Sequence, residues 1–128
     1  MGSAATVALG ISGETLACEA LTRLGYAILA RRYRTRVGEI DIVARDGRTL
    51  VFVEVKCRAS GRCGHPAEAV TPRKQRRVAA MANWYLSEHG LHGTLCRFDV
   101  VAVGLRPGEA PAIDVIRDAF QAGQAGAP

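Results

Sequence analysis

Residues 38–58 read GEIDIVARDGRTLVFVEVKCR. Two strand-like runs in this segment, 39–45 and 49–57, flank the dipeptide Asp46-Gly47, and apolar residues alternate with charged ones at 39–42 and 53–56. Alternation with a period of two is typical of β-strands, and Asp-Gly between two such runs is a strong signal of a hairpin turn. The segment therefore predicts a β-hairpin with Asp46 and Gly47 as its two-residue loop.

The alternation also predicts which side chains of the hairpin share a face. Residues two apart on a strand point the same way, so Glu39 joins Asp41 on the first strand and Glu54 joins Lys56 on the second. A register shifted by one residue would bury a lone carboxylate, and the hydrophobic pattern excludes it. The opposite face is expected to be apolar and to carry Ile40, Ile42, Ala44, Val51, Val53 and Val55.

The predicted pairing brings several carboxylates together. With a two-residue loop, Asp41 is expected opposite Phe52 and Glu39 opposite Glu54. Acidic side chains at this distance repel one another, and the ammonium of Lys56 compensates for one of them. Hard carboxylate oxygens suit Mg²⁺ or Mn²⁺, so the pattern favours a divalent metal site.

Lysine is rare in this chain, which holds two lysines, Lys56 and Lys74, among its 17 basic residues. Arginine keeps its charge and binds acceptors in a fixed fork. Lysine is a compact charge whose pKa can shift, so it can activate a water molecule or stabilise developing charge. The choice of lysine at position 56 therefore favours a chemical role, with chance as the alternative.

The remainder of the chain predicts one α/β domain over residues 1–120. The order is helix, three strands, helix, two strands, and the second helix serves as the crossover between parallel strands. Residues 58–66 are expected to form a loop and residues 121–128 a flexible tail. The further predicted elements are a helix over 12–24 with Ser12 as N-cap and Gly25 beyond its end, a strand over 26–34, a helix from Thr71-Pro72 to Gly90, and strands over 95–103 and 112–116.

Composition narrows the class of protein. The net charge is +5 and the pI is about 9.4, which suits a polyanionic partner. The chain has no apolar run of membrane-spanning length, and its start lacks the pattern of a secretory signal. We therefore expect a cytoplasmic protein with no membrane association, whose four scattered cysteines are reduced thiols.

The hairpin segment carries a resemblance to a known family. Together with Gly13-Glu14 upstream and RFDVV at 97–101 downstream, it resembles the YraN-like family of small bacterial predicted endonucleases. That family is similar to archaeal-type Holliday-junction resolvases within the PD-(D/E)xK nuclease superfamily. The resemblance implies a restriction-endonuclease-like three-layer sandwich, with a mixed central sheet of about five strands between helices.

The resemblance also implies roles for individual residues. Asp41 and Glu54 become the two acids of the motif and Lys56 its lysine. Glu14 becomes the helix acid that completes the metal pocket. With the backbone carbonyl of Val55, these acids would bind Mg²⁺ or Mn²⁺ for hydrolysis of nucleic-acid phosphodiesters.

Two features depart from or extend the motif. Ile40 stands where the superfamily's name-giving proline would be, and Glu39 is an accessory acid with no assigned role. The expected substrate is branched or structured DNA, with single-stranded DNA a further candidate, and coordinated cutting of two strands at a junction would require a homodimer. The residues expected to bind phosphates are Arg36, Arg58, Arg73, Lys74 and Arg77.

Other interpretations stay open at this point. The charged face could be a solvated hairpin with an ordinary ion pair, and Glu14 could interact only with the helix dipole. The protein could bind nucleic acid without cutting it, or serve as an interaction subunit of a larger assembly. Two further alternatives are a zinc site at Cys57, Cys63 and His65, and base stacking on Trp84.

Overall fold

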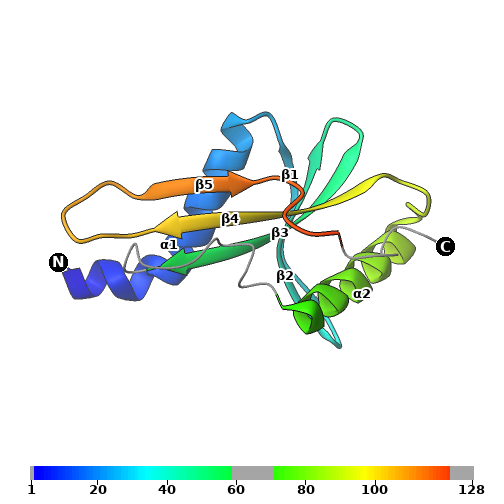
Figure 1. Ribbon diagram of the computed structural model, residues 1–128, viewed down its shortest axis with the longest axis horizontal. Helices are drawn as coiled ribbons and strands as arrows, with labels where there is room; N and C mark the ends of the chain where they lie inside the picture. Colours follow the sequence, from blue (N-terminus) through cyan, green and yellow to red (C-terminus); the bar gives the residue numbers. More distant parts are fainter. Residues whose placement is uncertain (1, 59–70, 122–128) are drawn as a thin grey trace.

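The computed structural model describes residues 2–58 and 71–121, with residues 2–12 as backbone only. The elements follow the predicted order of helix, three strands, helix and two strands (Figure 1). Their bounds are α1 Gly2–Arg23, β1 Ala27–Thr35, β2 Gly38–Asp46, β3 Thr49–Arg58, α2 Pro72–His89, β4 Cys96–Gly104 and β5 Ala112–Ile116.

The strands form one mixed sheet in the order β1-β2-β3-β4-β5. All neighbours are antiparallel except β3 and β4, which run parallel. A parallel pair needs a crossover connection, and α2 lies in the segment that supplies it. The predicted fold class, an α/β sandwich with a mixed five-stranded sheet, is confirmed.

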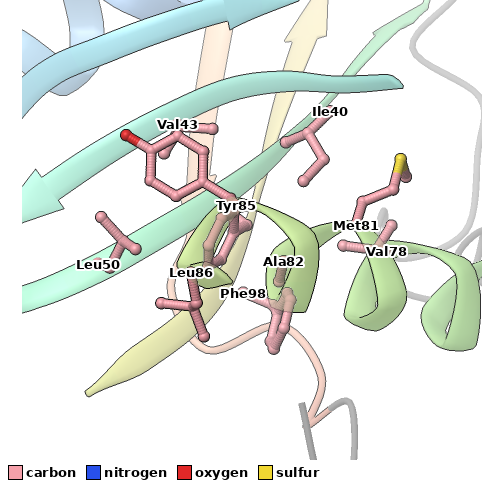
Figure 2. Packing of buried hydrophobic residues seen from close by; sticks show 10 residues of the cluster. Ile40, Val43, Leu50, Val78, Met81, Ala82, Tyr85, Leu86 and Phe98 are labelled. Carbon is pink, nitrogen blue, oxygen red and sulfur yellow. The ribbon is translucent and has the colours of Figure 1, made fainter. Parts of the chain in front are cut away.

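Each face of the sheet packs against one helix. On one face Val78, Met81 and Leu86 of α2 meet a cluster that includes Phe52 of the sheet, and Figure 2 shows the α2 side chains directed at the strands. On the other face Ala17 of α1 packs in a second cluster. Tyr85 is buried in the α2 cluster while its neighbour Trp84 is 47% exposed. The molecule therefore has the three layers of an α/β/α sandwich.

The hairpin loop differs from the predicted one. Asp46 pairs with Thr49, so the loop residues are Gly47 and Arg48. Gly47 has a φ of +62°, and a positive φ at the first central position of a hairpin turn suits glycine. The predicted pairs of Asp41 with Phe52 and Glu39 with Glu54 are therefore wrong by two residues. A shift of two does not by itself move a side chain to the other face.

The helix ends were predicted with mixed success. The first helix begins at Gly2 and runs through Ser12, so Ser12 is not its N-cap, whereas Gly25 follows its end with a φ of +94°. The second helix begins as predicted: Thr71 caps it by accepting a hydrogen bond from the backbone N–H of Lys74 at 3.2 Å. Gly90 ends this helix in the left-handed conformation, with a φ of +63°.

Several predictions concern residues that the structure does not describe. The predicted loop lies outside the described ranges from residue 59 onward, and the predicted tail does so from residue 122. The zinc alternative also rests on Cys63 and His65, which lie outside them. Cys18, Cys57 and Cys96 are free thiols. Neither helix in the described part has the length and apolar character needed to cross a bilayer.

A buried carboxylate joins distant parts of the chain. Asp99 of β4 is fully buried and accepts hydrogen bonds from Arg97 at 2.9 and 3.0 Å and from the hydroxyl of Tyr26 at 2.8 Å. The backbone N–H of Asp118 donates to the same carboxylate at 2.9 Å. Burial, together with the hydrogen bond that the Tyr26 hydroxyl donates to Asp99, raises the pKa of Tyr26 to about 12. Asp99 thus links β4 to the start of β1 and to the segment after β5.

Replacing this carboxylate should destabilise the fold strongly. Asp99→Ala removes the acceptor of the Tyr26 hydroxyl and one of the two carboxylates that pair with Arg97, the other being Asp46 at 3.0 Å, so we expect the free energy of unfolding to fall by about 2–3 kcal/mol. Urea unfolding followed by circular dichroism measures it. Asp114→Ala, at an exposed position of β5, is the control and should change stability by no more than about 0.5 kcal/mol. Equal stability of the two variants would contradict a central role for Asp99.

Candidate metal and phosphate site

The second strand departs from regular geometry at Asp41. Ile40 belongs to the cluster under α2, whereas Ile42 belongs to the cluster under α1. Residues two apart on a regular strand share a face, so the strand changes face between these two isoleucines and their predicted common face is wrong. Strands in the middle of a sandwich are covered on both faces, which allows apolar residues on either side.

Asp41 lies where the pairing between β2 and β3 ends. The last register pair toward this end is Ile42 with Val53. Beyond it, the backbone N–H of Val55 donates a 2.7 Å hydrogen bond to Oδ2 of Asp41. The carboxylate thus occupies a position where a strand carbonyl would otherwise accept, and it is held against the backbone of β3 beside Glu54.

Glu54 is held between two lysines. The Nζ of Lys56 lies 3.4 Å from Oε1 of Glu54, and the ammonium of Lys74, from the first turn of α2, bonds the same oxygen. The Glu54 side chain is only 14% exposed. These are the two lysines of the chain, so both meet at one carboxylate although arginine is far more frequent.

The electrostatics of the site follow from this crowding. Burial is the main cause that raises the pKa of Asp41 to about 6, and the neighbouring carboxylates of Glu54 and Glu14 raise it further. The hydrogen bond from Val55 acts in the opposite direction. The pKa of Lys56 is lowered, first by its contact with Lys74 and then by burial. Three acids and two amines therefore share one partly buried region.

Glu14 of α1 is buried and bonded to two consecutive arginines. The Nε atoms of Arg31 and Arg32 lie 3.0 and 3.3 Å from its two oxygens. Consecutive strand residues normally point to opposite faces, but Arg32 has a φ of +52°, in the left-handed region that non-glycine residues rarely adopt. This turn of the backbone lets both arginines reach one carboxylate.

Close approach of α1 to β3 brings Glu14 to the site. A Cβ on the preceding residue, Gly13, would lie 2.2 Å from Sγ of Cys57, so glycine permits this contact. Glu14 in turn acts on the pKa of Asp41 through its charge. The structure therefore places Glu14 close enough to Asp41 for its charge to act there. Its expected part in a metal pocket stays a prediction.

The donor set fits a hard divalent cation only in part. In residues 2–58 and 71–121, no group of three or more His, Cys, Asp or Glu side chains is arranged to hold a metal ion. Asp41 and Glu54 offer carboxylate oxygens, and the charge of Glu54 makes ionisation of Asp41 more costly. The ammonium of Lys74 already pairs with Glu54. The third acid, Glu14, is bonded to arginines instead.

Residues 13–103 match the model of the "Uncharacterised protein family UPF0102". This chain belongs to the UPF0102 family. A UPF0102 protein of Geobacter sulfurreducens is 49% identical over 113 residues, covering 88% of each chain. The UPF0102 protein of Symbiobacterium thermophilum is 50% identical over 114 residues, covering 89% of this chain and 97% of the relative. The resemblance to the YraN-like family, which is UPF0102, is thus confirmed.

The part of the chain that matches UPF0102 contains the whole charged site. It begins at Gly13, directly before the buried helix acid, and includes both strand acids and both lysines. Glu39, also within this match, lies elsewhere: it pairs with Arg34, its register partner on β1, at 2.8 Å. The expected position of Glu39 opposite Glu54 is therefore wrong.

Four of the predicted phosphate-binding residues come from β3, from α2 and from the turn between β1 and β2. Arg58 ends β3 two residues after Lys56, and Arg36 is exposed in the turn between β1 and β2. Arg73 and Arg77 are exposed on the first turns of α2. Their role in binding stays a prediction.

Sequence reasoning missed two features of this site. It placed Lys74 among the phosphate-binding residues and not on Glu54, and it did not connect Arg31 and Arg32 with Glu14. The rarity of lysine was a signal that could have grouped Lys74 with Lys56. No comparable signal marked the arginines, because their common target depends on the unusual φ of Arg32.

Ionised Asp41 should destabilise the metal-free protein. Because its pKa is raised from 3.8 to about 6 on folding, its contribution favours the folded state at low pH and is lost as the pH rises through that interval. Asp41→Asn keeps an oxygen for the Val55 N–H and removes the charge. We expect its melting temperature in EDTA at neutral pH to exceed that of the wild type by about 2–5 °C.

The pH dependence of stability tests whether the charge of Asp41 causes this difference in melting temperature. The stability difference between Asp41→Asn and the wild type should shrink as the pH falls from about 6 toward 4, because Asp41 then becomes protonated. Differential scanning fluorimetry across this range measures it. A difference that is constant with pH would show that the substitution acts through packing and not through charge.

Proposed function

We propose that this UPF0102 protein is an endonuclease that hydrolyses nucleic-acid phosphodiesters with Mg²⁺ or Mn²⁺. One observation carries the proposal: Asp41 of β2 is hydrogen-bonded to the backbone of β3 beside Glu54, where the pairing of the two strands ends. Lys56 of β3 pairs with the carboxylate of Glu54. Acid pairs of this kind are costly to a fold, and costly arrangements concentrate at functional sites. The resemblance to the PD-(D/E)xK superfamily assigns the same residues to metal binding and catalysis.

The chemistry expected of each group follows from its position. A bound divalent ion would supply Lewis-acid polarisation of the phosphate and neutralise charge that develops during hydrolysis. Asp41, Glu54 and the carbonyl of Val55 would hold it, and Glu14 would join them once released from its arginines. The ammonium of Lys56 would stabilise the pentacovalent transition state or orient the attacking water.

Substrate selection is expected to rest on shape and charge. The net charge of +5 and the basic side chains on β1, β3 and α2 favour the phosphate backbone, which positions a duplex without reading its sequence. We therefore propose branched DNA, of the kind cut by Holliday-junction resolvases, as the substrate in the cytoplasm. Paired cuts across a junction would need two copies of the site, and hence a homodimer.

Cleavage assays on labelled Holliday junction, flap, duplex and single-stranded DNA test the proposal. With Mg²⁺ or Mn²⁺ we expect the wild type to cut branched DNA, Asp41→Asn to be inactive, and Lys56→Ala to be slower by about 10²–10³-fold. Arg48→Gln removes one charge at the far end of the hairpin and should retain activity. Cleavage that survives in Asp41→Asn would contradict the assignment.

A non-catalytic nucleic-acid-binding module is the alternative, favoured by the basic side chains around the site. It predicts salt-sensitive binding of branched DNA with no cleavage under either metal ion. The same panel of substrates, measured by gel shift, separates the two functions.

A further inference from the structure

The strongest unexplained feature of the site is the presence of Lys74 on Glu54. Lys56 lies beside Glu54 because the two residues are neighbours on one face of β3. Lys74 belongs to a different element and reaches the same oxygen across the space between α2 and the sheet. The start of α2 must therefore be held in a set position for this contact to form.

The local structure of α2 provides that position. Thr71 caps the helix through the backbone N–H of Lys74, and Pro72 occupies the first turn, where its missing N–H has no cost. The backbone of Lys74 is thus anchored at its own amide. Its side chain is 35% exposed, which leaves the flexible four-carbon stem free to change direction.

The charges around the acids show what this contact does. Arg31 and Arg32 neutralise Glu14, and Lys56 together with Lys74 neutralises Glu54. Among the described residues, Asp41 forms no ion pair with a basic side chain. Lys74 bonds the Glu54 carboxylate through Oε1. A divalent ion shared by Asp41 and Glu54 would therefore compete with the Lys74 ammonium for the negative charge of that carboxylate.

We propose that Lys74 is a positioning residue that exchanges with the divalent ion: its ammonium holds Glu54 in the metal-free protein and moves to a substrate phosphate when the metal binds. The inference rests on the proposed function. In this exchange, metal binding and phosphate binding favour each other. Lys74 leaves Glu54 when the metal binds, and its positive charge then becomes available to the nucleic-acid backbone. The exchange also explains why two amines share one carboxylate.

Metal affinity without DNA tests this exchange directly. Mn²⁺ alone is titrated into the full chain and followed by electron paramagnetic resonance or calorimetry. Lys74→Gln removes the competing cation, so we expect it to bind Mn²⁺ about three- to tenfold more tightly than the wild type. Arg76→Gln, at an exposed position of the same helix, removes the same charge and should bind like the wild type. Lys74→Arg keeps a cation on Glu54 and should not gain affinity.

A second readout follows the released charge. Ca²⁺ should strengthen the binding of branched DNA by the wild type and by Arg76→Gln, and strengthen it several-fold less for Lys74→Gln. A merely structural role for Lys74 would weaken DNA binding without raising Mn²⁺ affinity. Tighter Mn²⁺ binding by Lys74→Gln together with the smaller effect of Ca²⁺ supports the exchange.

The outcomes separate this inference from the nuclease proposal. If Asp41→Asn abolishes Mn²⁺ binding but Lys74→Gln binds Mn²⁺ no more tightly than the wild type, the exchange is overturned and the metal site stands. If the wild type and Asp41→Asn bind Mn²⁺ equally, the metal site and the exchange are both overturned.

Discussion

The hydrogen bond from the Val55 N–H to the Asp41 carboxylate determines how the hairpin ends and where the acids lie. Up to Ile42 and Val53 the two strands pair through their backbones and are buried on both faces. Beyond that pair a side chain replaces a backbone acceptor. The strands can then diverge, and Glu54 and Lys56 become accessible at the edge of an otherwise apolar core. Without this substitution the buried pairing would continue and leave no room for a charged site.

A cluster of partly buried carboxylates destabilises the folded protein that contains it. Burial of Asp41, and after it the negative charges of Glu54 and Glu14, make the ionised carboxylate costly, and its raised pKa reflects that cost. Basic side chains from three elements compensate: β1 supplies arginines, β3 supplies Lys56 and α2 supplies Lys74. The rest of the fold supports the arrangement through two apolar clusters, one on each face. The buried Asp99 network adds links from β4 to the start of β1 and to the segment after β5.

Membership of UPF0102 and the geometry of the site support each other without depending on each other. The family match covers residues 13–103 and says nothing about chemistry. The contacts of both lysines with Glu54 and of the Val55 N–H with Asp41 come from the structure. The proposed nuclease activity connects them, because a metal ion held by two strand acids accounts for a costly cluster that a purely structural domain would not need.

The sequence by itself determined the order of elements, the hairpin, the caps of α2 and the family. Each of these depends on local patterns: alternation, Asp-Gly, Thr-Pro and a closing glycine. It also placed Glu54 beside Lys56, because strand periodicity keeps these residues on one face whatever the register. The role of both residues and of Asp41 in catalysis stays a prediction. The tertiary structure alone decided the two-residue shift of the hairpin register and the change of face at Asp41. It also decided the contacts of Lys74 with Glu54 and of two arginines with Glu14. Those features depend on the packing of helices against both faces and on an unusual φ at Arg32. Neither of these is marked by a periodic pattern in the sequence.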